Sequence, residues 1–176
     1  MRGQAGGTAG SGGPALSDST AAGTVLVGAS VGPPLHAAST TGAPLSLLDV
    51  TLTFASRAQW VWDAEQAAFL RNEGTTPAVS SDGARLSAQN VVVLGVEVRD
   101  TQFKDPAGTP VPETLLVGSG EGLVASAGKH VAVTWSQESV DEPLVLTGPD
   151  DEPVLLEQGV TWVELVPREG GSWTVS

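Results

Sequence analysis

The sequence predicts a mainly β domain, built chiefly from antiparallel strands and containing little helix. One strand is indicated by large apolar residues at alternate positions, the period-two pattern of a half-buried strand: Leu48, Val50, Leu52 and Phe54. The longest apolar run, NVVVLGVEV at 90–98, is rich in β-branched valine and predicts a central strand buried on both faces. After residue 75 no segment keeps a helical period, and short apolar runs alternate with turn-forming residues.

The chain divides by composition into three parts. Residues 1–22 are mostly Gly, Ala, Ser and Thr, too poor in large apolar side chains to offset the entropy of ordering, so we expect a disordered linker. Residues 23–45 contain one strand-like run, TVLVGASV, broken by prolines, and are expected to be irregular. The β domain is expected over residues 46–176.

The remaining strands are predicted from short apolar segments between turn residues. QWVWD and AEQAAFLRN are both interpreted as strands, and ETLLVGSG as a strand that ends in a glycine turn. LVASAGKHVAVTWSQ and PLVLTGPDDEPVLL predict hairpins that turn at AGKH and GPDDE. VTWVELV and SWTVS complete the set.

The charge and composition exclude several classes of function. Eight Lys and Arg against twenty Asp and Glu give a formal net charge of -12, which repels nucleic acid phosphates and anionic lipids. Without cysteine there is no disulfide, thiolate zinc site or cysteine nucleophile. No window approaches the roughly 20 apolar residues of a membrane span, and the first twenty residues lack the apolar core of a signal peptide. We expect either a cytoplasmic protein or a reading frame that begins inside a longer one.

An acidic stretch has two interpretations. Between Lys129 and Arg168 there is no Lys or Arg, while eight acidic residues lie from Glu138 to Glu164 inclusive. A solvated face that keeps the protein soluble is the favoured one, and a cation-dependent adhesive site is the alternative. Because 150–152 are adjacent acids without the alternating spacing of a calcium loop, we expect no metal and no cofactor.

Candidate ligand-binding residues cluster in WVWDAEQAAFLRN. Trp60 and Trp62 could stack on a ligand or fill the core, and Asp63 with Arg71 could form an ion pair at a strand edge. Asp63 and Glu65 could also serve as the carboxylate pair of a glycosidase, but at i, i+2 they share one strand face and do not flank a bond. The sequence offers no catalytic residue, and an enzyme is the less favoured interpretation.

Other aromatic and titratable residues fit structural roles better. Trp135 and Trp162 are expected in the core, and Trp173 is the tryptophan expected to be most exposed. His36 in a proline-flanked loop and His130 at a hairpin turn have no patterned acid or nucleophile beside them.

The glycine cluster GSGEG at 118–122 is interpreted as a turn. It lacks the Lys-Ser/Thr of a phosphate-binding loop, and it precedes a strand rather than a helix.

The order of these motifs resembles the C-terminal domain of the YerB-like family, bacterial lipoproteins of unknown function. The resemblance covers residues 50–167 and rests on WVWDAEQAAFLRNEGTTPAVSSDGARLSAQNVVV, VGSGEGLVASAGKHVAVTWSQ and EPLVLTGPDDEPVLLEQGVTWVELVP in succession. It implies a two-lobed α+β protein, exported and tethered outside the cytoplasmic membrane, whose larger N-terminal lobe is missing here; residues 23–45 resemble the tail of that lobe. Where relatives place His-x-Asp after a proline, this chain has Ala78, Val79 and Ser80.

The sequence and the resemblance together suggest a non-catalytic interaction module at the cell envelope. Its expected partner is the missing N-terminal lobe, an envelope protein or a cell-wall component, and the resemblance implies an extracytoplasmic, membrane-tethered location. The alternatives are a carbohydrate-active envelope enzyme that uses acidic residues such as Asp63 or Glu65, and the cation-dependent adhesive domain.

Overall fold

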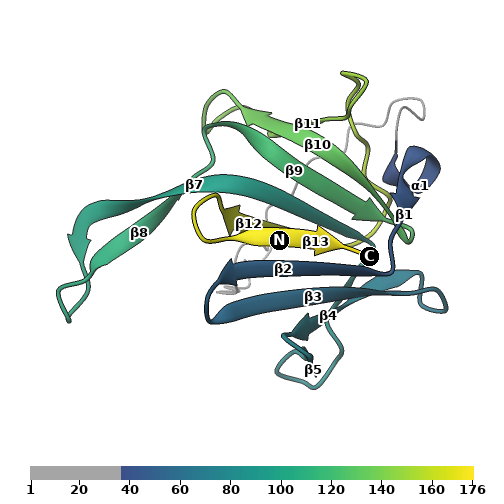
Figure 1. The fold of residues 1–176 in the computed structure, drawn as a ribbon, viewed down its shortest axis with the longest axis horizontal. Helices are drawn as coiled ribbons and strands as arrows, with labels where there is room; N and C mark the ends of the chain where they lie inside the picture. The colour runs from purple at the N-terminus through teal and green to yellow at the C-terminus, as the bar shows by residue number, and fades with distance from the viewer. Residues whose placement is uncertain (1–36) are drawn as a thin grey trace, which may run out of the picture.

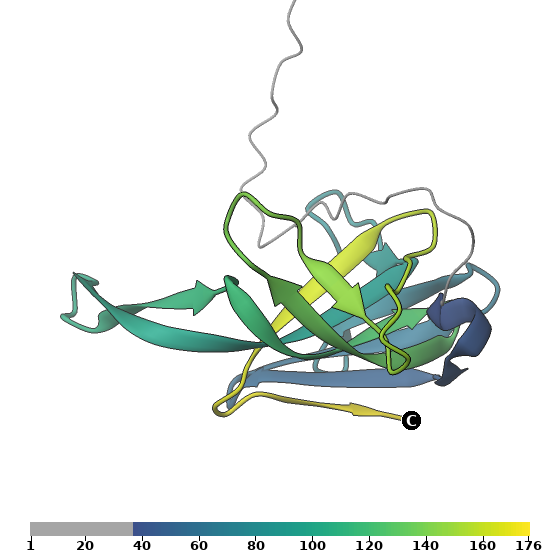
Figure 2. The same cartoon turned by 90° about the horizontal axis from the view of Figure 1, so that it is seen from above.

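The computed structural model describes residues 37–176, which form two β-sheets packed face to face (Figure 1, Figure 2). The first sheet has the order β1-β10-β9-β7-β12, with β11 beside β10 and β8 beside β7. The second has the order β13-β2-β3-β4-β5, with β6 beside β4. The mainly antiparallel β fold expected from the sequence is confirmed, and the one parallel pair joins β12 to β7 within the described residues.

The element bounds are as follows. The first sheet consists of β1 (Ala43–Pro44), β7 (Asn90–Lys104), β8 (Pro110–Leu115), β9 (Gly118–Ser126), β10 (Lys129–Gln137), β11 (Val145–Thr147) and β12 (Thr161–Pro167). The second consists of β2 (Leu47–Thr53), β3 (Ser56–Asp63), β4 (Ala68–Glu73), β5 (Thr76–Pro77), β6 (Ser87–Ala88) and β13 (Ser172–Val175). A single helical turn, α1 (Ala38–Thr41), precedes β1.

Residues 37–45 pack against the first sheet. Ala38 in α1 is fully buried, and β1 pairs with the start of β10. The prediction for residues 1–22 and the larger part of the one for residues 23–45 lie outside the described residues, and the domain boundary at residue 46 stays a prediction.

The core has two layers, one on each face of the first sheet. Between the sheets, Val91 and Val93 of β7 pack with Trp60, Phe69 and the other members of one buried cluster. On the opposite face, Val92 and Leu94 pack with a second buried cluster that includes Trp135. Alternate residues of β7 therefore enter different layers, which confirms the central strand buried on both faces.

Two local expectations are wrong. Phe54 does not continue the buried face of β2, because the strand ends at Thr53 and Phe54 lies in the turn, fully exposed. The GSGEG glycines at 118–122 do not form the turn; they lie within β9, paired with β10 from Gly118 to Gly122. The separate turn predicted at AGKH is confirmed: the β9–β10 hairpin turns at Ala127 and Gly128, both with positive φ.

The second half of β7 leaves the body of the fold. Beyond Val96, β7 no longer pairs with β12 and pairs only with β8. Residues 97–115 project past both sheets (Figure 1, Figure 2). We call this two-stranded ribbon the arm. Its exposed apolar residues include Val98, Phe103 and Val111, and Phe103 is 68% exposed.

Within residues 37–176, no helix has the length and apolar character that crossing a bilayer requires.

Candidate functional site

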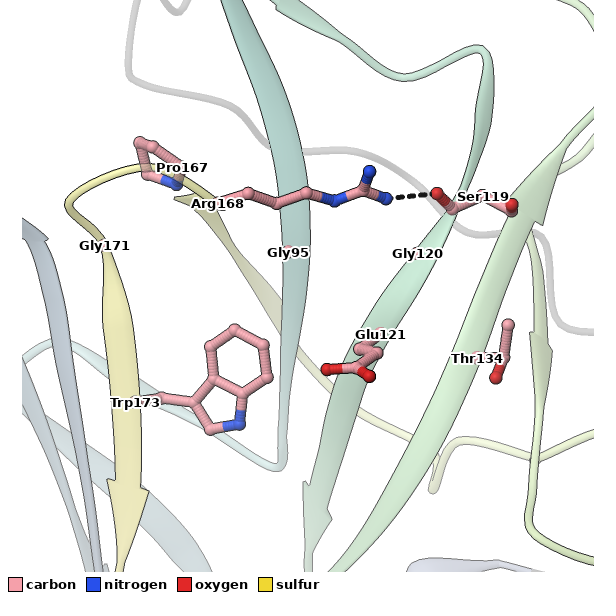
Figure 3. Close-up of a pocket in the computed structure, with 9 residues that line it drawn as sticks. All are labelled: Gly95, Ser119, Gly120, Glu121, Thr134, Pro167, Arg168, Gly171 and Trp173. Atoms are coloured by element: carbon pink, nitrogen blue, oxygen red, sulfur yellow. Dashed lines mark hydrogen bonds between the residues drawn. The ribbon is translucent and has the colours of Figure 1, made fainter.

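A groove runs along the first sheet beside the edge of the second. It consists of two adjoining hollows of about 710 and 350 Å³, which share Glu121, Thr134 and Trp173. Figure 3 shows the larger hollow, with the Trp173 indole on one side and Glu121 and Thr134 on the other. We call the combined space the Trp173 groove; each of its two hollows lies in the range of about 300–1,000 Å³ usual for small-molecule sites.

The sheet edges place the side chains of the groove. β13 is the edge strand of the second sheet, and its pairing with β2 sets Trp173 opposite Val50. The indole reaches across to Gly95 of β7, where an added Cβ would lie 3.4 Å from the ring. On β9 and β10, Glu121 and Thr134 are register partners and both are exposed.

Gly120 makes room for a hydrogen bond at the floor of the groove. The Trp135 indole N–H donates to the Gly95 carbonyl at 3.1 Å. A Cβ at Gly120 would lie 2.6 Å from that carbonyl oxygen and 2.7 Å from the Trp135 nitrogen. Such distances are far inside van der Waals contact, so the backbone must be bare here, and this is the role of a glycine that the sequence suggested was in a turn.

Arg168 forms the rim of the groove. Its backbone N–H donates to the Val96 carbonyl at 2.8 Å, extending the line of β12. Its guanidinium stretches along the rim and donates to the Ser119 carbonyl (Figure 3). The groove thus carries one cationic and one anionic side chain, Arg168 and Glu121.

A second polar cluster is buried between the sheets. Glu164 of β12 is 4% exposed and accepts a hydrogen bond at 3.0 Å from the indole N–H of Trp60, which is fully buried. Arg71 reaches the same carboxylate, with Nε 3.5 Å from Oε1, and also pairs with Glu73. The Arg71 guanidinium carbon lies 5.0 Å from the centre of the Trp162 ring, a cation–π distance.

The electrostatics of this cluster are set mainly by burial. Desolvation raises the pKa of Glu164, and the hydrogen bond from Trp60 and the charge of Arg71 offset it only in part. The carboxylate that joins the two sheets is therefore buried at a desolvation cost that the Trp60 hydrogen bond and the Arg71 charge do not fully offset.

The structure brings Trp60 and Arg71 together but leaves Trp62 and Asp63 apart from them. Trp60 and Arg71 are register partners on β3 and β4, whereas Asp63 faces Ala68. The expected Asp63–Arg71 ion pair does not form, since Arg71 pairs with Glu73 and Glu164. Trp62 is half-buried against Phe69, with ring centroids 4.9 Å apart. A ligand at these four residues stays a prediction.

Asp63 is engaged in the turn between β3 and β4. Its carboxylate accepts backbone N–H bonds from Glu65 at 2.9 Å and Gln66 at 3.0 Å. These bonds, led by the one from Gln66, lower the pKa of Asp63. Its chemistry is that of a turn-capping carboxylate.

The acidic stretch and the histidines do not converge. Among residues 37–176, no group of three or more His, Asp and Glu side chains is placed to hold a metal ion. His130 lies in β10 beside the hairpin turn, and its Nδ1 is buried with no hydrogen-bond partner in the described part of the chain. His36 lies outside the described residues.

A match to a family model shows which protein family the chain belongs to. The family model described as "Protein of unknown function (DUF3048) C-terminal domain" matches residues 49–163. The chain belongs to this family.

A solved structure shares the fold of this DUF3048 C-terminal domain. The chain is similar to the YerB protein from Bacillus subtilis, with a TM-score of 0.59 and 18% sequence identity. The match covers 78% of this chain and 46% of the YerB chain, so this chain spans less than half the length of YerB. The resemblance seen in the sequence is thereby confirmed. No curated protein matches the sequence.

The sequence did not reveal the Trp173 groove of this DUF3048 domain. Its side chains come from distant strands, so no contiguous motif contains Gly95, Gly120 and Trp173. Two signals were available, the dense glycines of GSGEG and the expected exposure of Trp173, but only the sheet pairing shows that they meet.

Proposed function

We propose that this DUF3048 C-terminal domain is a non-catalytic interaction module of the cell envelope, and that its arm docks on another lobe of the same protein. The arm, residues 97–115, is the observation that carries the proposal. An isolated two-stranded ribbon is marginally stable in water, so a partner surface would stabilise this projection.

The arm offers a mixed surface suited to contact between lobes. Near its tip Phe103 is 68% exposed, and Val98 and Val111 are also exposed. Close to the body, the Arg99 guanidinium donates to the Glu113 carboxylate at 3.0 Å across the two strands. An exposed aromatic among paired charges is typical of the modestly polar interfaces, about 600–1,500 Å², between lobes of one chain.

The proposed occupant follows from the comparisons. The family is described as a C-terminal domain, and more than half of YerB has no counterpart in this chain. We therefore assign the arm to an N-terminal lobe rather than to an unrelated protein. The envelope location comes from the sequence resemblance and belongs to the proposal.

The two alternatives gain no support. The Asp63 carboxylate is engaged by the backbone of its own turn, and Glu65 lies in that exposed turn. The acidic stretch supplies no cluster of three carboxylates in the described residues.

Site-specific crosslinking tests the docking of the arm. Replacing Phe103 with a photoreactive benzoylphenylalanine, in the full-length protein in its own cells, should crosslink to a peptide of the N-terminal lobe identified by mass spectrometry. Phe54 is the matched control, an equally accessible phenylalanine in the β2–β3 turn. A crosslink yield at Phe103 no higher than at Phe54, or crosslinks at Phe103 that omit the N-terminal lobe, would refute the docking.

Cell fractionation tests the location. We expect the native protein in the membrane fraction and accessible from outside the cytoplasm. A wholly cytoplasmic protein would remove the envelope part of the proposal and leave the docking of the arm intact.

A further inference from the structure

We propose that the Trp173 groove is a binding site for a neutral oligosaccharide. The inference rests on the chemistry of the groove and is independent of the arm, so either proposal can fail without the other.

The charges of the groove favour a ligand without net charge. Glu121 and Arg168 contribute one negative and one positive side chain to the larger hollow. Arg168 repels a metal ion or other small cation, and Glu121 repels a phosphate or other anion, so a ligand of either charge lies near a like charge. A neutral polyol meets neither penalty, and it can donate to the carboxylate and accept from the guanidinium.

The groove presents polar groups that hydrogen-bond nothing else in the described residues. Within residues 37–176, the Trp173 indole N–H, the Glu121 carboxylate and the Thr134 hydroxyl make no hydrogen bond to the protein. Together they offer a donor, an acceptor and a group that does both. Sugar hydroxyls require this mixture, because each one both donates and accepts.

An aromatic surface accompanies those polar groups. Trp173 reaches over Gly95, where an added Cβ would lie 3.4 Å from the ring, so a larger side chain at that position would crowd the indole. The apolar C–H face of a pyranose ring can pack on an indole, which combines a large apolar surface with one polar edge. The sequence suggested that Trp173 is the most exposed tryptophan, and in the structure it is half-buried and lines both hollows.

The length of the groove favours more than one sugar ring. The second hollow continues from Trp173 past Leu123 and Ala132 to Gly148 and Pro149. A chain of linked rings would follow this path, with Trp173 at the middle, where the two hollows meet.

A zwitterion such as an amino acid is the competing occupant, since it also carries no net charge. Its carboxylate could pair with the donors of Arg168 that the bond to the Ser119 carbonyl leaves free (Figure 3). A small zwitterion would fill only part of the two adjoining hollows, so the extent of the groove favours the oligosaccharide.

Titration with defined tetrasaccharides tests the proposal. Chitotetraose, cellotetraose and maltotetraose are titrated into the whole chain by calorimetry and tryptophan fluorescence, with glycine and glycylglycine as the zwitterionic probes. We expect at least one tetrasaccharide to bind, with an affinity nearly independent of salt, because no net charge is neutralised.

Variants locate the site. Trp173→Ala and Glu121→Gln should each weaken binding about tenfold, while Trp173→Phe should keep most of the affinity because it keeps a ring. Phe54→Ala is the matched control, since it removes an exposed aromatic outside the groove. Far-ultraviolet circular dichroism confirms that each variant is folded.

Three results would overturn the proposal. They are no binding of any of the three tetrasaccharides, binding that Trp173→Ala and Glu121→Gln leave unchanged, and salt-sensitive binding of the zwitterions in place of sugar.

Discussion

Replacing Glu164 with alanine tests whether the buried cluster joins the two sheets. The change removes the acceptor 3.0 Å from the Trp60 nitrogen and the carboxylate 3.5 Å from Arg71 Nε. Trp60 is fully buried and the side chain of Arg71 is 10% exposed, so water reaches neither group easily to replace the lost partner.

The expected loss in the free energy of unfolding depends on which partners Arg71 keeps. Removing one partner of a buried ion pair costs about 3–5 kcal/mol, and Arg71 keeps its pairing with Glu73, so we expect the lower end, about 3 kcal/mol. Against the total stability of about 5–15 kcal/mol usual for a domain, that is a large fraction.

Urea unfolding followed by circular dichroism measures the loss without depending on the altered tryptophan environment. Glu73→Ala is the control, because that side chain is 58% exposed and its pairing with Arg71 should contribute only about 0–1 kcal/mol. Glu164→Gln should cost less than Glu164→Ala, since its amide oxygen can still accept from Trp60. A Glu164→Ala protein within about 1 kcal/mol of the parent would show that the cluster does not stabilise the fold, contrary to the cost expected for a broken buried pair.

Further variants test the crowding at Gly120 and the pH dependence of stability that Glu164 and Asp49 contribute. Gly120→Ala should destabilise the fold by about 1–3 kcal/mol, because the new Cβ overlaps the Gly95 carbonyl; an unchanged melting temperature would contradict the crowding. Burial raises the pKa of Glu164, so the folded state holds this proton more tightly than the unfolded state, whose pKa is near 4.5. The part of the stability that is linked to this proton is then fully present below that value and is lost as the pH rises through the raised folded pKa. Glu164→Gln, which cannot titrate there, should remove that loss in urea unfolding measured across the same pH range. Asp49 has the opposite sign, because its hydrogen bond from Arg57 lowers its pKa; stability is lost as the pH falls through that lowered pKa, and acid titration of Asp49→Asn should show a smaller loss.

Local pattern predicted much of the fold. Leu48 and Val50 are buried at alternate positions of β2, and the valine run of β7 is central and buried on both faces. These features depend on side-chain alternation and on hydrophobicity, which neighbouring residues determine. The hairpin turn at Ala127 and Gly128 was likewise visible in the sequence.

Features that depend on distant strands could not be predicted. Whether a glycine such as Gly120 lies in a turn or under a crossing indole depends on where Trp135 and Gly95 meet. Arg71 pairs with Glu164 because β12 packs over β3 and β4, although the sequence suggested nearby Asp63. The Trp173 groove was missed for the same reason, while the burial of Trp135 required only local pattern and was predicted correctly.

The place of β13 in the second sheet has a consequence for folding. β13 pairs with β2, the first strand of the same sheet, so this edge of the sheet joins two segments that lie far apart in the sequence. Until β13 leaves the ribosome, one edge of β2 has no partner strand. Pairings between strands that lie so far apart in the sequence also form slowly. The Trp173 groove therefore forms only after β13 has been synthesised, whereas the other strands that line it come earlier in the chain.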